Sequence, residues 1–377
     1  MPLKIFISAG DISGDIHAAG LIARCAAESG AIEWYGLGGS NMKEAGCRLL
    51  IEPESDPVIG FRRVIGKVPY YFRLLARIHR TFAESPPDLV VLVDYPGLNT
   101  QIARLAKMIG IRVVYFICPQ YWAWAPWRVR RFSRLVDKAL VIFPFEESYL
   151  SSHGVDTTYV GHPVFDRAPR AETRFEQVTP INSAKRLALL PGSRKHEVES
   201  NLPVMLRAAA ELLRNESDLV PTLTHQRPDC IALAEKLAGG SGVKLQTTDA
   251  DLVETARASR LCLVASGTAT LEVALSGTPF VVVYRVSPLA RRLARVLLTV
   301  PWFCQVNLIA GESLVPEFLL SDDNPSPVVA TCRDLLGQTV ARQDAIDRLG
   351  RFKDEHYEPG ALDRAAQALL SFTCGQS

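Results

Sequence analysis

The chain has 377 residues, of which 48% are hydrophobic and 22% charged, fractions that exclude a disordered, collagen-like or low-complexity protein. Lysine and arginine number 42 against 40 aspartate and glutamate residues, and the resulting net charge of +2 predicts no nucleic-acid partner. At about 100–200 residues per domain, the length predicts two domains, each with its own core. No apolar run reaches the ~18 residues that a membrane-spanning helix needs.

Short runs of Val, Ile, Leu and Phe alternate with segments of helical period in the first half of the chain. Nearly continuous hydrophobicity over such a run is typical of a parallel strand covered on both faces. The predicted strands are Leu3–Ser8, Ile32–Leu37, Leu89–Val93, Val113–Ile117 and Ala139–Phe143. The predicted helices are Ile16–Glu28, Tyr70–Glu84 and Asn99–Met108. This alternation indicates βα units and an open parallel sheet.

A polar, proline-punctuated stretch, Gly161–Ser183, predicts a connection between domains. The alternation then restarts, with predicted strands at Leu187–Leu190, Pro221–Thr224, Val243–Gln246, Leu261–Ala265 and Phe280–Tyr284 and a helical tail over Asp344–Leu370. The fold class is therefore α/β, with two Rossmann-like domains of parallel strands. The expected boundaries are 1–165, 166–345 and a helical tail at 346–377, for which packing against the N-terminal domain is one arrangement.

Ligands bind outside the carboxyl ends of strands in open α/β sheets, so the loops after the predicted strands are candidate sites. The first is Ala9–Asp15, with His17 shortly after it. Its two glycines permit a tight turn, and the following helix N-terminus offers N–H groups to an anion or a sugar hydroxyl. The segment lacks the GxGxxG fingerprint. Taken alone, it favours the alternative that Ser13 or Asp15 simply caps the helix.

The second loop is Val93–Asn99, in which Asp94 follows a buried strand. A carboxylate there is costly unless it is paired or faces a cleft. Asp94 is therefore a candidate general base, or a residue that orients one. A cap for the helix that opens near Asn99 is an equally good interpretation.

The third loop contains Gly192, Ser193 and Arg194 at the start of a helix. Backbone donors and a fork-shaped cation together form a phosphate cradle. The GK[ST] ending of a Walker A motif is absent, which disfavours ATP hydrolysis. Alternatively, Glu197 and Glu199 simply neutralise Arg194 at the surface.

The fourth loop contains Ser266, Gly267 and Thr268, with Glu272 on the first turns of the next helix. Small residues let a diphosphate approach the helix N-terminus, and a carboxylate one turn along can bind ribose hydroxyls. The alternative is that Ser266 and Thr268 cap the helix. Two anion-binding loops in one domain favour a nucleotide ligand.

Two basic, acid-free segments also carry large apolar residues: Ile59–Phe82 and Pro288–Phe303. This combination suits a surface that meets anionic lipid, slightly ahead of ordinary amphipathic helices with a basic solvated face. A third cluster consists of tryptophans and arginines that either line an acyl or sugar site or fill a core: Trp122, Trp124, Trp127, Arg128, Arg130 and Arg131.

Nothing in the sequence predicts a metal site or a serine hydrolase. The histidines are dispersed, HExxH and GxSxG are absent, and Asp94 is not part of a DxD pair. The eight cysteines are scattered without a CxxC motif, so reduced core thiols are expected.

A set of motifs together resembles a known family. In chain order they are AGDISGD with a following His, YGLGGSNMKEAG, VDYPGLN, CPQYWAW, FPFE, VGHP, LPGSR with a Glu three residues later, ASGTATLE, Tyr284-Arg285, and NLIAG followed by VPEFL. They resemble lipid-A-disaccharide synthase, an inverting glycosyltransferase family of the GT-B type, over nearly the whole chain. The resemblance implies two Rossmann-like domains whose parallel sheets face each other across a cleft.

The family's reaction moves 2,3-diacylglucosamine from UDP to 2,3-diacylglucosamine 1-phosphate, giving a β-1,6 disaccharide phosphate and UDP. The resemblance places the acceptor in the N-terminal domain and UDP-diacylglucosamine in the C-terminal domain, and it implies neither a cofactor nor a metal. The implied catalytic residues are Asp94 as base, with His17 and Asp11. The implied substrate-binding residues include Arg194 for the diphosphate and Glu272 for the ribose; the full set is Ser13, Gly14, Gln120, Gly192, Ser193, Arg194, Ser266, Gly267, Thr268, Glu272, Tyr284, Arg285 and Asn307.

Three positions depart from the family pattern: Asp11 replaces a Glu, Arg63 an acid, and Leu320 a Gln. The resemblance predicts a cytoplasmic enzyme of lipid A assembly, peripheral on the inner face of the cytoplasmic membrane of a Gram-negative-type bacterium. The alternatives are a diverged GT-B paralogue that uses another UDP-sugar, such as a peptidoglycan-type transferase or an epimerase, and a non-catalytic lipid-binding relative.

Overall fold

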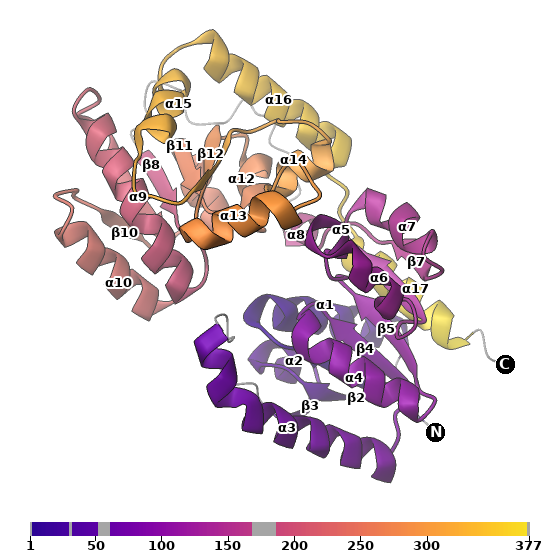
Figure 1. Ribbon diagram of the computed structural model, residues 1–377. Coiled ribbons are helices and arrows are strands. Elements are labelled where there is room, and N and C mark those ends of the chain that lie inside the picture. Colours follow the sequence, from indigo (N-terminus) through magenta and orange to yellow (C-terminus); the bar gives the residue numbers. More distant parts are fainter. Residues whose placement is uncertain (1, 30–31, 52–60, 168–185, 375–377) are drawn as a thin grey trace. The chain divides into compact units, whose positions relative to one another are not determined.

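The computed structural model describes residues 2–29, 32–51, 61–167 and 186–374 (Figure 1). The chain forms two compact units. Unit 1 comprises Met1–Asp166 and Glu358–Ser377, and unit 2 comprises Arg167–Tyr357. Both are α/β units built on one parallel sheet, as the alternation of apolar runs and helical segments predicts.

Unit 1 contains a seven-stranded sheet in the order β3-β2-β1-β4-β5-β6-β7. The central strands are buried on both faces, which explains their continuous apolar sequences. The strands are β1 (Leu3–Ala9), β2 (Ile32–Leu37), β3 (Arg48–Ile51), β4 (Leu89–Val93), β5 (Arg112–Phe116), β6 (Lys138–Val141) and β7 (Asp156–Tyr159).

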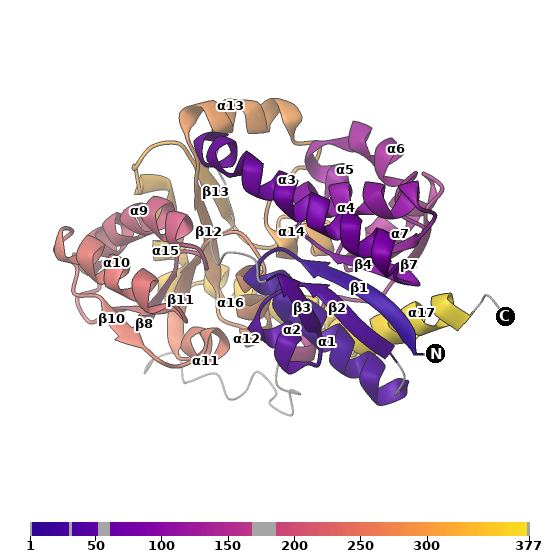
Figure 2. The same ribbon diagram turned by 90° about the horizontal axis from the view of Figure 1, so that it is seen from below.

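Helices cover both faces of this sheet. In Figure 2, α3 and α4 lie on one face of it and α1, α2 and α17 on the other. The helices of unit 1 are α1 (Ile12–Glu28), α2 (Ser40–Glu44), α3 (Phe61–Glu84), α4 (Pro96–Met108), α5 (Tyr121–Trp124), the 3₁₀ turn η1 (Pro126–Arg128), α6 (Val129–Phe132), α7 (Pro144–Ser151) and α17 (Ala361–Cys374). The helix α8 (Val164–Arg167) ends at the boundary between the units.

Unit 2 has a six-stranded sheet in the order β10-β9-β8-β11-β12-β13. Its strands are β8 (Arg186–Leu190), β9 (Val220–Thr224), β10 (Gln246–Thr248), β11 (Ser259–Val264), β12 (Phe280–Arg285) and β13 (Glu317–Leu320). Its helices are α9 (Lys195–Leu213), α10 (Pro228–Gly239), α11 (Leu252–Arg257), α12 (Ala269–Ser276), α13 (Pro288–Leu297), α14 (Gln305–Ala310), α15 (Ser326–Leu336) and α16 (Val340–His356). Side chains of α9, α10 and α15 form the main core with the sheet.

The predicted tail is two helices that belong to different units. Proline and glycine at 359–360 separate α16 from α17, and only α17 belongs to unit 1. Asp166 holds the start of α17 by accepting hydrogen bonds from the amides of Ala361 (3.0 Å) and Leu362 (2.8 Å). Farther along, Arg112 donates to the carbonyl of Phe372 (3.1 Å). The chain therefore returns to unit 1 at Glu358, after the end of α16, whereas the expected boundary at 346 lies inside that helix.

Three short edge strands, β3, β7 and β13, were not predicted, and β10 begins three residues after the predicted start at Val243. The sequence of β7, DTTY, is half-exposed and lacks an apolar run. Most of the predicted connection, from 168 to 183, lies outside the described residues, as do Ile59 and Gly60 and the side chain of Arg63. The seven cysteines whose side chains are described are free and buried, which confirms for them the expectation of core thiols.

Candidate functional site

The first two candidate loops meet at the switch point of the unit 1 sheet. β1 lies between β2 and β4, so the connections that follow β1 and β4 diverge and leave room beyond the strand ends. The ring of Tyr95 lies directly against Gly10, where a Cβ atom would come within 2.1 Å of it. Gly10 is therefore required for the close approach of the two loops.

The turn after β4 is strained and held from several sides. Asp94 and Tyr95 both have φ = 47°, a left-handed conformation that costs roughly 1–2 kcal/mol per non-glycine residue. The carbonyl of Asp94 accepts from Asn99 Nδ2 (2.7 Å) and Tyr115 Oη (2.6 Å), and Ser8 Oγ donates to Asn99 Oδ1 (2.7 Å). Strain that is held in place by its surroundings is typical of functional sites.

Asp94 is not the N-cap residue of the following helix. Helix α4 begins at Pro96, and its N-cap residue is Tyr95, whose side chain makes no cap hydrogen bond. Asn99, where the helix was expected to open, lies one turn inside it and is fully buried. The half-buried Asp94 therefore lies between the end of β4 and the N-cap residue of α4.

The loop after β1 does contain a helix cap, but the capping residue is Asp11. Its Oδ1 accepts from the amide of Gly14 (2.8 Å), whereas Ser13 is exposed. Asp15 instead holds the start of α2 by accepting from the amides of Gly39 (2.7 Å) and Met42 (3.1 Å). The loop thus caps α1, as the alternative predicted, but the capping residue is neither Ser13 nor Asp15.

His17 is buried close to His162, which follows β7. Burial, together with the charge of His17, lowers the pKa of His162 to about 3. His162 Nδ1 also accepts from the amide of Val164 (3.2 Å). At neutral pH His162 is therefore uncharged, and sequence reasoning missed it as a site residue although VGHP is one of the family motifs.

A buried carboxylate, Glu146, lies beyond the end of β6. Its Oε1 accepts from Trp122 Nε1 (2.8 Å) and its Oε2 from the amides of Ile142 (3.3 Å) and Phe143 (3.1 Å). Burial raises its pKa to about 7 despite these three donors. Glu146 thus fixes Trp122, two residues after the half-buried Gln120 that opens α5. The FPFE motif was the only sequence signal for it.

The third and fourth loops lie at the equivalent switch point of unit 2. β8 lies between β9 and β11, and the loops after β8 and β11 are those at 191–194 and 265–268. Each leads into a helix N-terminus, that of α9 or α12. The two predicted anion-binding loops are therefore neighbours.

In the loop after β8, Glu197 occupies part of the expected phosphate cradle. Its Oε2 accepts from the amides of Ser193 (2.9 Å) and Arg194 (3.2 Å), and its Oε1 pairs with Arg194 NH1 at 3.3 Å. Gly192 has φ = 116° and faces the same carboxylate. Glu197 therefore neutralises Arg194, whereas Glu199 is exposed.

His225 and Asn201, neither of them predicted, support this loop. His225 Nδ1 accepts from the amide of Arg227 (3.0 Å), so Nε2 carries the proton and donates to the carbonyl of Gly192 (3.1 Å). The fully buried Asn201 donates to the carbonyl of Pro191 (2.8 Å) and accepts from the amide of Arg285 (2.8 Å). A single polar residue within a helix carries no sequence signal for such a role.

In the loop after β11, the expected caps do not form. Thr268 is the N-cap residue of α12 but makes no side-chain cap bond, and Ser266 Oγ donates to the carbonyl of Phe303 (2.8 Å). Gly267 has φ = 150°, and no atom outside its chain neighbours lies within 4 Å of the position that a Cβ atom would take. Glu272 is half-buried, and burial raises its pKa while the charge of Arg167 opposes the rise.

The other residues of unit 2 that the sequence singled out lie outside these two loops. Tyr284 is half-buried, and burial raises the pKa of its hydroxyl, with smaller effects from Glu197 and Arg194. Arg285 pairs with Asp323 at 2.7 Å. Asn307 is fully buried and makes three bonds of 2.9 Å with the backbone at 314–315, so it positions that loop. Leu320, a departure from the family pattern, packs in the core.

Comparison with known proteins identifies the family. A family model described as lipid-A-disaccharide synthetase matches residues 5–371. The chain belongs to the lipid-A-disaccharide synthase family. Lipid-A-disaccharide synthase of Syntrophus aciditrophicus is 36% identical over 97% of this chain and 97% of its own. That of Acidobacterium capsulatum is 38% identical, over 95% and 93%.

Solved structures agree on the fold. A UDP complex of MnaA from S. aureus superimposes with a TM-score of 0.65 at 14% identity, covering 98% of this chain and 96% of its own. The calicheamicin glycosyltransferase CalG4 gives 0.60 at 14% identity, covering 100% and 99%. The lipid-A-disaccharide synthase family member is thus a glycosyltransferase with a GT-B fold, and its family membership disfavours the epimerase and the non-catalytic alternatives.

The described residues contain neither a cluster of metal-ligating side chains nor a membrane-spanning helix. Within 2–29, 32–51, 61–167 and 186–374, no group of three or more His, Cys, Asp or Glu side chains is placed to hold a metal ion. In the same part of the chain, no helix is both long and apolar enough to cross a bilayer.

Proposed function

We propose that this family member transfers 2,3-diacylglucosamine from UDP to 2,3-diacylglucosamine 1-phosphate, forming the β-1,6 disaccharide 1-phosphate of lipid A with inversion. The observation that carries the proposal is the family match across residues 5–371, which includes the polar loops at both switch points. The strained turn at Asp94 and the Arg194 loop then supply a base and a diphosphate site.

Asp94 is proposed as the general base. It takes the proton from the 6-hydroxyl of the acceptor as that oxygen forms a bond to C1 of the donor sugar. The bond from C1 to the diphosphate oxygen breaks, and UDP leaves with the electron pair. A turn held at the Asp94 carbonyl by Asn99 and Tyr115 keeps the base in place, which limits the reorganisation needed in the transition state. His17 and Asp11 are proposed to act beside it.

On the donor side, Arg194 is proposed to bind the diphosphate and Glu272 the ribose. The N-terminus of α12, behind Gly267 and Thr268, adds backbone donors and the positive end of a helix dipole. We propose that this charge stabilises the leaving UDP without a metal ion. Activity that persists in excess chelator would support this point, and activity restored only by added Mg²⁺ would contradict it.

The decisive assay mixes the purified full chain with both acylated substrates in detergent and follows disaccharide phosphate and UDP together. Equal formation of the two products supports the proposed reaction. Binding of UDP without disaccharide formation would instead favour a diverged paralogue with another sugar. Binding of acylated sugar that ignores UDP, and that survives Asp94→Asn and Arg194→Ala, would favour the non-catalytic relative.

We further propose that the enzyme works as a cytoplasmic protein on the inner face of the cytoplasmic membrane. Helix α13 exposes four apolar side chains, Leu289, Leu293, Val296 and Leu297, next to the exposed Arg292. Unit 1 also exposes large apolar side chains, at Trp127 (62% exposed) and Phe72 (69% exposed). Apolar side chains interleaved with arginine suit the interface of an anionic bilayer.

Flotation with vesicles tests this surface. The triple variant Leu289→Ser, Leu293→Ser and Val296→Ser should lose most of its binding to vesicles containing anionic lipid. Val340→Ser, at an 88% exposed position on α16, is the matched control and should bind like the native chain. Equal binding of all three proteins would contradict a role for α13.

A further inference from the structure

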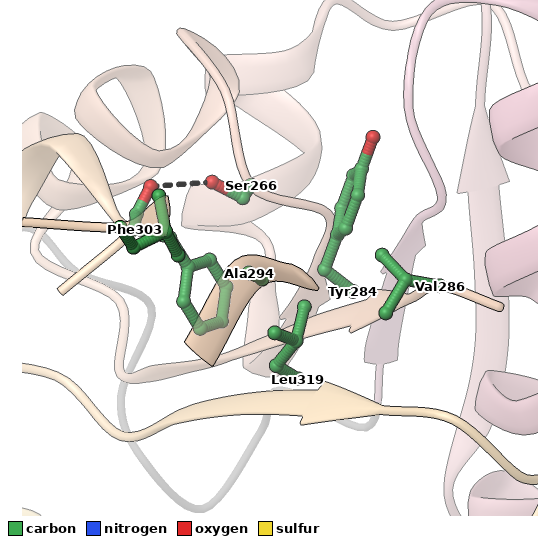
Figure 3. Close-up of a pocket in the computed structure, with 7 residues that line it drawn as sticks. Ser266, Tyr284, Val286, Ala294, Phe303 and Leu319 are labelled. Atoms are coloured by element: carbon green, nitrogen blue, oxygen red, sulfur yellow. Dashed lines mark hydrogen bonds between the residues drawn. The ribbon is translucent and has the colours of Figure 1, made fainter. Parts of the chain in front are cut away.

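Unit 2 contains an apolar cavity of about 250 Å³ near the loop after β11 (Figure 3). Tyr284 and Val286 at the end of β12 and Leu319 on β13 form one wall. Ala294 on α13 and Phe303 after it form the other. The ring of Phe303 points towards Ala294 and Leu319 in Figure 3. These side chains are only half-buried, so the cavity leaves apolar surface uncovered within an otherwise packed unit.

Polar groups contribute little to this cavity. Ser266 is the polar residue at its edge besides Tyr284, and its hydroxyl already donates to the carbonyl of Phe303 (2.8 Å; Figure 3). Apart from the hydroxyl of Tyr284, the cavity offers no lining side-chain group that is free to hydrogen-bond a sugar or a phosphate. It suits a ligand that brings apolar surface alone.

The cavity adjoins both loops assigned to the nucleotide. Ser266 begins the loop that leads into α12. The hydroxyl of Tyr284 lies close enough to the other loop for the charges of Glu197 and Arg194 to affect its pKa. A group that extends from a nucleotide bound at these loops can therefore reach the cavity at its Ser266 and Tyr284 edge.

Helix α13 forms one wall of the cavity. Arg291 on its inner side donates to Ser321 Oγ (2.9 Å) at the end of β13. Ala294 and Leu298, three and seven residues farther, line the cavity, whereas Leu293 and Val296 are exposed on the outer side. The helix is thus apolar on the side that faces the cavity and also on its outer side.

We propose that this cavity binds one fatty acyl chain of the UDP-linked donor sugar. The inference rests on the proposed function, because only an acylated donor carries both a diphosphate for the two loops and a chain for the cavity. At about 30 Å³ for a water-sized group, the volume holds a segment of roughly eight methylene-sized groups. The cavity therefore discriminates between donors by chain length.

The test replaces the small residue of the cavity wall with a large one. Ala294→Phe fills the cavity, and Ala290→Phe places the same side chain one turn earlier at an exposed position of α13. For Ala294→Phe, kcat/KM with a long-chain donor should fall about tenfold, the effect of losing roughly two buried methylene groups. A donor with short chains, and the affinity for UDP itself, should change less than about twofold. Ala290→Phe should match the native chain in all three.

A second variant works in the opposite direction. Val286→Ala enlarges the cavity and should shift the preference towards longer chains without changing UDP binding. If the native chain is active but both cavity variants keep its chain-length profile, the cavity proposal is overturned while the proposed function stands. If the native chain makes no disaccharide from any acylated donor, the proposed function itself fails. Loss of vesicle binding by Ala294→Phe, with unchanged donor kinetics, would assign the cavity to a bilayer lipid and also overturn the proposal.

Discussion

At the switch point of unit 1 the turn is held by neutral donors that bind a backbone carbonyl, whereas at that of unit 2 a carboxylate binds backbone amides. Asn99 and Tyr115 both donate to the carbonyl of Asp94. Glu197 accepts from Ser193 and Arg194. Neutral bonds add no charge near Asp94, while Glu197 reduces the positive charge of its own loop. Changes in unit 1 should therefore affect the rate of the chemical step and folding stability, and changes in unit 2 mainly the affinity for an anion.

The largest expected effect is that of Asp94→Asn. A positioned general base contributes about 10²–10⁴-fold, so kcat should fall by at least about a hundredfold. The affinity for UDP, measured by calorimetry, should stay within about twofold because the proposed UDP ligands all belong to unit 2. A similar loss of UDP affinity would contradict the assignment of the chemical step to the switch point of unit 1 and of UDP binding to that of unit 2.

The next effect concerns pH and Glu146. Its pKa is raised from 4.5 to about 7 by burial, so the folded protein binds this proton more tightly than the unfolded chain. Its contribution to stability is complete below pH ~4.5 and is lost as the pH rises to ~7, a total of roughly 3 kcal/mol at 1.36 kcal/mol per pKa unit. Glu146→Gln is neutral at every pH and should lack this fall.

Urea unfolding of the native chain, Glu146→Gln and a control variant between pH 4.5 and 8 measures this difference. The stability of Glu146→Gln relative to the native chain should improve from pH 4.5 to about 7 and change little above that. Glu147→Gln, at the exposed neighbouring position, should show no such trend. Parallel curves for all three proteins would mean that the three donors around Glu146 keep it ionised in the folded state.

The candidate loops could be found from the sequence because each follows a continuous apolar run that can only be a buried strand. Leu89–Val93 was predicted with its observed bounds, and Asp94 was singled out as the residue after it. The supporting side chains could not be found in this way. Asn99 and Asn201 donate hydrogen bonds to the carbonyls of Val93 and Pro191. The positions of these carbonyls depend on the turns after β4 and β8, which the sequence pattern does not give. The edge strand β7 has no apolar run, and Glu197 binds amides that were expected to be open.

Asn99→Leu should weaken the Asp94 turn directly. Asn99 is fully buried, and the substitution leaves Ser8 Oγ and the carbonyl of Val93 without this partner, at a cost of about 2 kcal/mol. Urea unfolding should show this loss, together with a lower kcat, because the left-handed turn can relax. Tyr115→Phe removes the other bond to the Asp94 carbonyl and should cost about 1 kcal/mol. A fully active and stable Asn99→Leu protein would show that backbone packing alone holds the turn.

The smallest effect is expected at Glu197, where charge and hydrogen bonding can be separated. Glu197→Gln keeps an oxygen that accepts from the amides of Ser193 and Arg194 but no longer neutralises Arg194. The affinity for UDP should therefore rise by up to about fivefold, in line with the ~0.2–1 kcal/mol of a partly exposed ion pair. The gain should shrink as salt is added, because screening weakens the attraction between Arg194 and the diphosphate.

Glu197→Ala tests the second contribution of Glu197, its hydrogen bonds to the loop amides. It removes the acceptor as well as the charge, so the amides of Ser193 and Arg194 at the start of α9 lose their partner and the protein loses about 1 kcal/mol of stability. The exposed Glu199→Gln is the control for a general change in net charge and should leave UDP affinity nearly unchanged. If Glu199→Gln tightens UDP binding as much as Glu197→Gln does, the effect is a long-range one of net charge. If only Glu197→Gln does so, the carboxylate at the loop competes directly with the diphosphate for Arg194, and the switch point of unit 2 is set for release of UDP as well as for its binding.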